Sequence, residues 1–217
     1  MGAIADMTAM LQFSGGESIM DPTPAKANQK SYRKFVSLGN GRKVMLKFLN
    51  GEDRQEFTRL FQEARPEDVR FLKENFKDSR FLDEWLKKVD YQRLLPLVAV
   101  DMDSQRLVAN ANLYVGKFAA RHIGEISLYV SELYRNVGLG SMMVNELLGL
   151  AMKKGLFWLR VSILAEEKKL INAFRTKGFQ VKATLEDFFM RQDGMTQDVV
   201  LMMRPVLQDD EIGRAHV

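Results

Sequence analysis

The 217-residue sequence predicts a mixed α/β domain whose sheet is largely antiparallel. Apolar residues recur at helical spacing in some segments, whereas they alternate or form short runs in others. Two turn sequences, Asn40-Gly41 and Asp193-Gly194, each lie between extended segments, as in antiparallel hairpins. The predicted order is strand, strand, helices, three strands, helix, strand, helix, two strands, and no internal repeat is visible.

The predicted domain begins with two strands, at residues 31–38 and 42–49, on either side of the first turn. Asn50 stands where a helix N-cap is expected, and acidic residues follow it in the first turn. A helix ending near residue 64 comes next, then a second helix starting at Pro66 and a short third one. The apolar residues at helical spacing in these three segments are Phe57, Leu60, Phe61, Val69, Phe71, Leu72, Phe76, Phe81, Leu82, Trp85, Leu86 and Val89.

Strands dominate the middle of the sequence. Residues 94–102 form a short apolar run, which is typical of a strand buried on both faces. Residues 105–115 alternate, so Asn110 and Asn112 are expected to face away from the apolar side. A further strand is predicted at residues 121–130. The residues predicted to share the apolar side of the alternating strand are Leu107, Ala109, Ala111, Leu113 and Val115.

The last part of the domain alternates between helices and strands. Residues 140–154 have the spacing of an amphipathic helix, and residues 157–164 that of a strand. A helix at residues 167–177 ends at Gly178, because glycine readily stops a helix. A final hairpin is predicted over residues 179–204.

Three segments divide the chain. Residues 1–30 lack periodicity and are interpreted as a flexible N-terminal arm, residues 31–206 as one folded domain, and residues 207–217 as a C-terminal tail. The start of the chain lacks the basic region and apolar core of a signal peptide. No apolar run reaches the roughly 18 residues of a membrane span. We therefore expect a cytoplasmic protein with no membrane partner.

Composition excludes several classes of function. The apolar fraction of 46% and charged fraction of 28% are those of a globular protein, not of a disordered chain. The net charge of +4 is small and its signs are interspersed, so no nucleic-acid partner is expected. The sequence has no cysteine and two histidines, so we expect no thiol chemistry and no metal site. Carboxylates, hydroxyls, backbone groups or a bound co-substrate must supply the chemistry.

One loop has the composition of an anion site. Residues 135–141, Arg-Asn-Val-Gly-Leu-Gly-Ser, join a strand to the start of a helix. Glycines allow close approach of a ligand, and the free N–H groups of the helix's first turn suit a pyrophosphate. A dinucleotide fingerprint would need glycine at Met143, and no P-loop pattern matches. The remaining alternative is a tight turn whose glycines serve packing alone.

The pattern Arg135-x-x-Gly138-x-Gly140 resembles the loop with which the GNAT superfamily of N-acetyltransferases holds acetyl-CoA. The preceding strand 125–130, the helix ending in Lys-Gly-Phe179 and the closing hairpin are also similar to that family. The opening segment 41–47 resembles the GNAT domains of bacterial protein-lysine acetyltransferases. The resemblance implies the GNAT acyl-CoA N-acyltransferase fold over residues 31–206, a central twisted sheet with flanking helices, and acetyl-CoA as co-substrate.

The resemblance also implies which residues bind the cofactor. The strand before the loop is expected to splay from residues 157–164 and to pair with the pantetheine arm through backbone groups. Phe174 would pack beside the cofactor, with core packing as its alternative role. The expected cofactor-binding residues are Leu128, Val130, Arg135, Asn136, Val137, Gly138, Leu139, Gly140, Ser141 and Phe174.

Glu125 and Tyr129 are the catalytic candidates. A carboxylate within an apolar strand is costly unless it is paired or functional, and burial would raise its pKa toward that of a base. By resemblance, Glu125 would deprotonate the amine; the alternative is a structural carboxylate paired to Arg160 or Arg121. The family often has a tyrosine acid where this chain has Phe174. Tyr129, on the same strand face as Glu125, is the substitute candidate.

The sequence therefore predicts an N-acetyltransferase that passes an acetyl group from acetyl-CoA directly to a primary amine in a ternary complex. The amine is a protein lysine or a small molecule. The alternative is a non-catalytic acyl-CoA-binding or sensor module of the same fold, since the tyrosine hydroxyl is missing. The acceptor, the acyl-chain preference, the oligomeric state (a homodimer included) and the role of residues 1–30 are left open.

Overall fold

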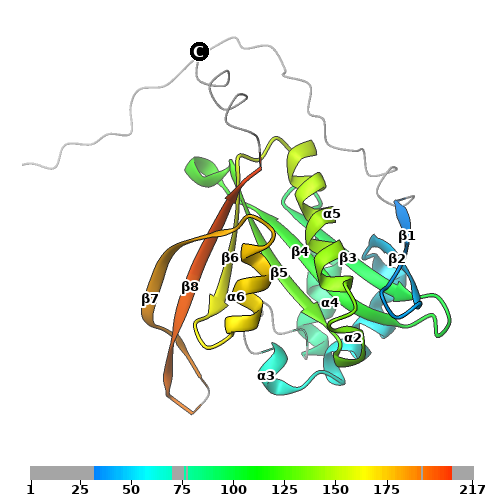
Figure 1. The fold of residues 1–217 in the computed structure, drawn as a ribbon. Coiled ribbons are helices and arrows are strands. Elements are labelled where there is room, and N and C mark those ends of the chain that lie inside the picture. The colour runs from blue at the N-terminus through cyan, green and yellow to red at the C-terminus, as the bar shows by residue number, and fades with distance from the viewer. Residues whose placement is uncertain (1–31, 70–75, 77, 192, 207–217) are drawn as a thin grey trace, which may run out of the picture.

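The computed structural model describes residues 32–69, 76, 78–191 and 193–206, and these contain one eight-stranded sheet (Figure 1). Its order is β1-β2-β3-β4-β5-β6-β8-β7, and every neighbouring pair is antiparallel except β5–β6, which is parallel. The predicted mixed, largely antiparallel sheet is confirmed. The predicted arm and tail, residues 1–30 and 207–217, lie outside the described residues. The strands are β1 (Arg33–Ser37), β2 (Lys43–Phe48), β3 (Leu94–Asp101), β4 (Leu107–Val115), β5 (Ile123–Val130), β6 (Trp158–Leu164), β7 (Gln180–Met190) and β8 (Thr196–Pro205).

Helices connect the strands in the predicted order. Pro66 begins a helix as expected, and Phe71 and Leu72 of that predicted helix lie outside the described residues. Among the described helices, none is both long and apolar enough to cross a membrane. The helices are α2 (Arg54–Gln62), α3 (Pro66–Val69), α4 (Ser79–Lys88), α5 (Leu139–Lys153) and α6 (Lys168–Arg175), with the 3-10 turns η1 (Gly51–Asp53), η2 (Phe118–Ala120) and η3 (Glu132–Tyr134).

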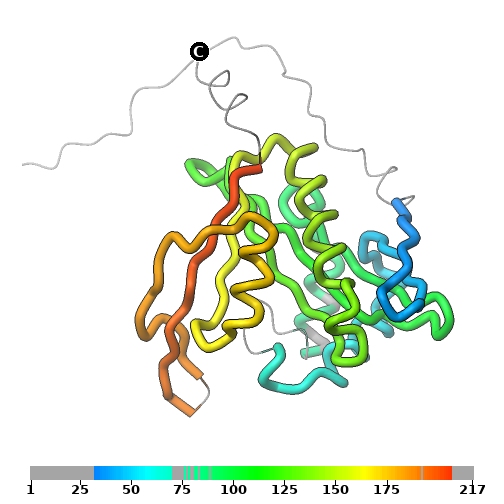
Figure 2. The backbone as a smooth tube through the Cα atoms, in the orientation of Figure 1, coloured from blue at the N-terminus to red at the C-terminus, as the bar shows by residue number. Residues whose placement is uncertain are grey.

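The helices form a layer on each face of the sheet (Figure 1). On one side, which we call the α5 face, α5 and α6 bury residues such as Leu147 and Phe174 against the strands. On the other side, the α2 face, α2 and α4 pack an aromatic cluster that includes Phe57 and Phe61. Figure 2 traces the chain from β6 through α6 to β7, after which β8 returns between β6 and β7. Helices therefore cover both faces of the sheet. This arrangement agrees with the sequence, in which segments with helical spacing of apolar residues are interspersed with strand-like segments.

The entry into α2 follows the predicted cap. The side chain of Asn50 accepts a hydrogen bond from the N–H of Glu52 at 2.8 Å, and Asp53 accepts from the N–H of Asn50 at 3.0 Å. This reciprocal pair satisfies two backbone donors at the start of η1, which leads directly into α2. The N-cap prediction for Asn50 is confirmed.

A β-bulge changes the face of Leu107. Ala99 pairs with Ala109, but the next residue, Val100, pairs with Leu107, so Val108 is the extra residue. Leu107 therefore packs in the α2-face cluster, and Val108 packs in the α5-face cluster. The prediction that Leu107 shares the face of Ala109 is wrong, because the bulge interrupts the alternation that it assumed.

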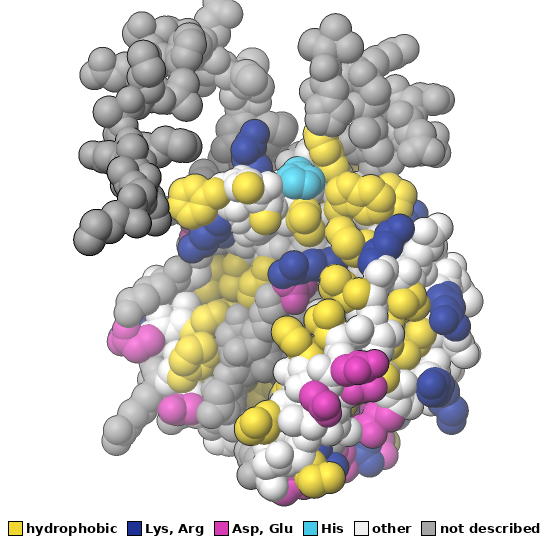
Figure 3. All heavy atoms as spheres, turned by 90° about the vertical axis from the view of Figure 1, so that its left-hand side faces the viewer, with side chains coloured by type: hydrophobic (Ala, Val, Ile, Leu, Met, Phe, Trp, Pro, Cys, Tyr) yellow, Lys and Arg dark blue, Asp and Glu magenta, His cyan; other side chains and the backbone are white. Residues whose placement is uncertain are grey.

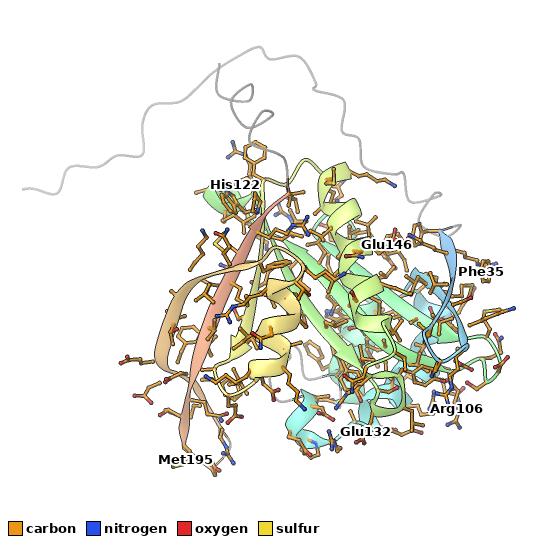
Figure 4. The ribbon with its side chains drawn as sticks, in the orientation of Figure 1. Phe35, Arg106, His122, Glu132, Glu146 and Met195 are labelled. Atoms are coloured by element: carbon orange, nitrogen blue, oxygen red, sulfur yellow. The ribbon has the colours of Figure 1, made fainter. Side chains whose placement is uncertain are left out.

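The β7–β8 hairpin forms one edge of the sheet. Figure 3 looks toward this side of the molecule, and Figure 4 labels Met195 at the hairpin tip. The turn places Gly194 at φ 82°, a conformation that favours glycine, so the predicted Asp193-Gly194 turn is confirmed. Exposed charged side chains on β7, Lys182 and Glu186, limit pairing of this edge with other strands.

Candidate functional site

The two parallel strands at the centre of the sheet separate after a short contact. β5 and β6 pair only from Ile123–Trp158 to Glu125–Arg160, and beyond that point β5 keeps β4 as its partner while β6 keeps β8. The splay expected from the resemblance is therefore present in the structure. It leaves an opening in the sheet whose base lies at Glu125 and Arg160.

The free edge of β5 exposes backbone groups to this opening. The N–H of Ser131 donates to the carbonyl of Val108, and the carbonyl of Ile123 accepts from the N–H of Gly116, both at 2.9 Å. Odd-numbered residues of β5 thus direct their backbone groups to β4. Alternation directs those of Leu128 and Val130 toward the opening. The carbonyl of Val130 accepts a hydrogen bond from Arg135 Nε there, so an extended ligand could pair with Leu128 and with the N–H of Val130.

The glycine-containing loop lies at the end of this free edge. Gly138 adopts φ 91° immediately before α5, a conformation that is strained for residues with a side chain. A Cβ atom added to Gly140 would lie 3.5 Å from Leu128 Cδ2 and 3.7 Å from Val130 Cγ2, so this glycine packs on the open strand. The N–H groups of the first turn of α5 have no carbonyl earlier in the helix to bind, which makes this end of α5 suited to an anion.

Arg135, the first residue of the motif, is held by protein groups. Its Nε donates to the carbonyl of Val130 at 2.9 Å, and its two terminal nitrogens lie 3.2 and 2.9 Å from the carboxylate oxygens of Asp68 in α3. Asp68 also binds Arg65 at 2.9 Å. Burial alone would raise the pKa of Asp68, but the hydrogen bonds from Arg65 and Arg135 hold it below its usual value. Arg135 thus ties the end of β5 to α3, and the backbone N–H groups at the start of α5 are further donors that suit a phosphate.

The other expected loop residues differ in their surroundings. Leu139 is fully buried in the α5-face cluster, whereas Asn136 and Ser141 are exposed. Asn136 adopts φ 59°, a left-handed conformation that asparagine tolerates better than most residues. The carbonyl of Val137 accepts from the N–H of Gly39 at 3.0 Å, which joins the loop to the β1–β2 turn.

Glu125 lies at the base of the opening, in an ion pair. Arg160 Nε and a terminal nitrogen donate to one carboxylate oxygen of Glu125 at 2.9 and 2.6 Å. The Glu125 side chain is 12% exposed and that of Arg160 is 44% exposed, so the pair reaches solvent. The sequence left Arg160 or Arg121 as the partner of Glu125 if this carboxylate is structural, and the structure shows the pair with Arg160. An ion pair that stays open to water is compatible with either role for the carboxylate.

A chain of polar side chains runs along β4 beside Glu125, and the sequence did not identify its two asparagines as part of a site. Asn110 Nδ2 donates to Asn112 Oδ1 at 3.2 Å, and Asn112 Nδ2 donates to Tyr114 Oη at 3.1 Å. Tyr114 is the cross-strand partner of Glu125, and Asn112 that of Ser127. Both asparagines are buried, 1% and 0% exposed. The two asparagines within an apolar strand could have indicated such a chain from the sequence, because buried amides require polar partners.

Tyr129 shares the face of Glu125, as alternation predicts, but its ring belongs to the aromatic cluster of the α2 face. It is 5% exposed, and its centroid lies 5.3 Å from that of Phe61. Burial raises the pKa of the Tyr129 phenol. A raised pKa makes the hydroxyl a weaker acid, which does not favour proton donation. Catalysis by Tyr129 stays a prediction.

Phe174 belongs to α6, and its side chain is buried in the core. It is 4% exposed, and its ring meets that of Phe179 edge-on at 5.1 Å. These contacts agree with the core-packing role, and its contact with a cofactor stays a prediction. His122 precedes β5, so it lies at the opposite end of that strand from Glu132 and the loop (Figure 4). Within the described ranges, no group of three or more acidic or histidine side chains could hold a metal ion.

Comparisons with known proteins agree on one family. The model of the acetyltransferase (GNAT) family matches residues 54–179. No match was found among curated proteins. Solved structures share the fold at low identity. They include a phosphinothricin acetyltransferase from Sinorhizobium meliloti in complex with AcCoA (TM-score 0.65, 20% identity, covering 75% of this chain and 88% of that chain). A ribosomal-protein-alanine N-acetyltransferase from Brucella melitensis is also similar (TM-score 0.65, 22% identity, covering 74% of this chain and 98% of that chain). So is a GNAT-family acetyltransferase from Streptococcus pneumoniae (TM-score 0.62, 18% identity, covering 75% of this chain and 99% of that chain).

Proposed function

The chain belongs to the acetyltransferase (GNAT) family, and from that premise we propose that it transfers an acetyl group from acetyl-CoA to a primary amine, directly and in a ternary complex. The observation that carries the proposal is the free edge of β5 beside the glycine loop. Backbone groups of Leu128 and Val130 face the opening. The first turn of α5 adds N–H donors at one end of it.

The proposed binding mode uses these two features together. The pantetheine arm of acetyl-CoA extends the sheet by pairing with Leu128 and with the N–H of Val130, whose carbonyl is bound by Arg135. Its pyrophosphate binds the N–H groups of residues 137–141. The remaining loop residues, Arg135 and Asn136, hold the backbone in place, and Phe174 supports the cofactor from the core.

In the proposed chemistry, Glu125 removes a proton from the acceptor ammonium group, directly or through a water molecule. The freed amine attacks the thioester carbonyl, whose oxygen is polarised by a backbone N–H of the β5 edge. The attacking nitrogen loses its second proton to water as the C–S bond breaks, which leaves a neutral amide, and CoA leaves as a thiolate. Tyr129 is the proposed proton donor to that thiolate; a thiol pKa of about 8.5 means that protonation helps departure without being essential.

The acceptor is proposed at the level of a primary amine. Two structurally similar proteins are described as phosphinothricin and ribosomal-protein-alanine acetyltransferases, so the fold accommodates small and protein acceptors. We keep both a small-molecule amine and a protein lysine as candidates. The polar row of Asn112, Tyr114, Glu125 and Arg160 beside the opening is where the acceptor amine would approach.

The first test is protection against thermal unfolding. Acetyl-CoA at millimolar concentration should raise Tm by several degrees, because a ligand that binds only the folded state stabilises it. Free CoA and NADH are the comparators, and NADH should have little effect. No shift with acetyl-CoA would contradict the proposal.

The second candidate, a non-catalytic acyl-CoA-binding module, is favoured by two observations: Phe174 offers no hydroxyl, and Glu125 is paired with Arg160. Glu125→Gln separates the two candidates. An enzyme should lose at least about a hundredfold in turnover with amines or lysine peptides, while its acetyl-CoA affinity is retained. Thiol release measures turnover. Acetyl-CoA binding without thiol release from any amine tested would support the binding module.

A further inference from the structure

A buried hydrogen bond joins the cofactor loop to a distant turn of the sheet. The hydroxyl of Tyr134, in η3 immediately before the loop, donates to Asp101 Oδ2 at 2.9 Å. Asp101 is the last residue of β3 and is 3% exposed, and Tyr134 is 9% exposed. The two residues are 33 positions apart in the sequence. Neither belongs to the residues proposed to touch acetyl-CoA.

The Asp101 carboxylate is held firmly by the turn between β3 and β4. Its Oδ1 accepts from the N–H of Asp103 at 3.1 Å, and from the N–H and hydroxyl of Ser104, each at 2.8 Å. Oδ1 thus accepts the hydrogen bonds of the turn, and Oδ2 accepts the hydrogen bond from Tyr134. The acceptor that Tyr134 binds is therefore fixed before any ligand arrives.

The β1–β2 turn holds the same loop at two more points. The guanidinium carbon of Arg42 lies 4.8 Å from the centroid of the Tyr134 ring, within the range of a cation–π contact. The N–H of Gly39 donates to the carbonyl of Val137 at 3.0 Å. On the opposite side, Arg135 fastens the loop to Val130 and Asp68. Contacts with the β1–β2 turn and with α3 therefore hold the chain just before Gly138.

We propose that Asp101 and Tyr134 are positioning residues for acetyl-CoA binding, acting through the loop at residues 135–141. This inference rests on the proposed function. Backbone N–H groups bind a pyrophosphate best when they already converge, because ordering them upon binding costs free energy. The bond between Tyr134 and Asp101 supplies that order to η3, and η3 leads directly into the loop.

Two matched variants test the proposal, because each removes one hydroxyl from the same carboxylate. Tyr134→Phe removes the bond to Oδ2, which holds the loop, and Ser104→Ala removes a bond to Oδ1, which holds only the turn. Tyr134→Phe should raise the dissociation constant of acetyl-CoA by on the order of tenfold, as expected for the loss of about one hydrogen bond. Ser104→Ala should leave it within about twofold of wild type. Titration calorimetry well below both Tm values measures this.

Hydrogen exchange provides a second readout that requires no ligand. The amides of residues 135–141 should exchange faster in Tyr134→Phe than in Ser104→Ala at equal loss of global stability. Equal affinities and equal exchange in the two variants would overturn the proposal, and so would equal weakening of acetyl-CoA binding. Wild-type protein that binds no acetyl-CoA would instead overturn the proposed function, and the inference with it.

Discussion

Asp101 shows how one side chain links the pH dependence of stability to a buried site. Burial alone would raise the pKa of its carboxyl group. The hydrogen bonds donated by Ser104, Tyr134 and the Asp103 N–H outweigh burial and hold that pKa below its usual value. Since the folded pKa lies below the unfolded value of about 3.9, the charged form stabilises the fold. That contribution is present above pH 4 and is lost as the pH falls through the folded pKa.

Asp101→Asn should therefore lower the free energy of unfolding at pH 7 by about 1–3 kcal/mol, because an amide accepts fewer and weaker hydrogen bonds. The difference between the variant and wild type should narrow as the pH falls from about 4 toward 2, where the wild-type carboxyl becomes protonated. Urea unfolding at pH 7 and pH 3 measures both. A difference that is the same at the two pH values would show that the Asp101 charge contributes nothing.

At the scale of elements, the contact between β5 and β6 depends on Gly124. A Cβ atom there would lie 2.6 Å from Leu159 Cδ2, 2.7 Å from Leu113 Cδ1 and 2.8 Å from Leu156 Cδ1. All three leucines are buried, so their methyl groups have little room to move. Glycine is required here by space, next to Glu125, where the two strands begin to separate.

Gly124→Ala should lower the free energy of unfolding by about 1–3 kcal/mol through overpacking. Gly149→Ala is the matched control: Gly149 lies within α5, and a Cβ atom there meets nothing within 4 Å. Alanine at position 149 should stabilise the protein by about 0.5–1 kcal/mol, because glycine is a poor helix former. Chemical denaturation of both variants measures the contrast. Equal effects of the two substitutions would contradict this explanation of Gly124.

At the scale of the whole molecule, two hydrophobic clusters share one sheet. β3 contributes Leu97 and Ala99 to the α5-face cluster and Val98 and Val100 to the α2-face cluster. The two helix layers therefore pack on opposite faces of the same strands. Loss of either cluster should therefore weaken the strands on which the other depends, and the described domain should unfold as one cooperative unit.

Phe57→Ala on the α2 face should cost about 3–5 kcal/mol, and Leu147→Ala on the α5 face about 2–5 kcal/mol. Each variant should still unfold in a single transition. Far-UV circular dichroism and tryptophan fluorescence should give coincident curves, because Trp85 lies in α4 and Trp158 in β6. A first transition seen only by fluorescence in Phe57→Ala would show that the α2 layer unfolds separately.

Local chemistry in the sequence was sufficient to predict much of this protein. The Asn40-Gly41 and Asp193-Gly194 turns, the Asn50 cap and the start of α5 behind Gly138 depend on neighbours within a few residues. Periodicity alone gave the order of strands and helices in the described chain. Spacing also located the motif from Arg135 to Gly140, and with it the family. These features are predictable because propensity, capping and alternation are local properties.

Tertiary structure decided the contacts that give each candidate residue its surroundings. The sequence left Glu125 between two roles, and the structure supplied Arg160 as its partner across the splayed strands. Arg135 was expected among the cofactor-binding residues, and the structure adds its ion pair with Asp68 of α3. The bulge at Val108 and the bond between Tyr134 and Asp101 were likewise not predicted. Each depends on residues far apart in the chain, and their approach is determined by strand order and register, which periodicity does not encode.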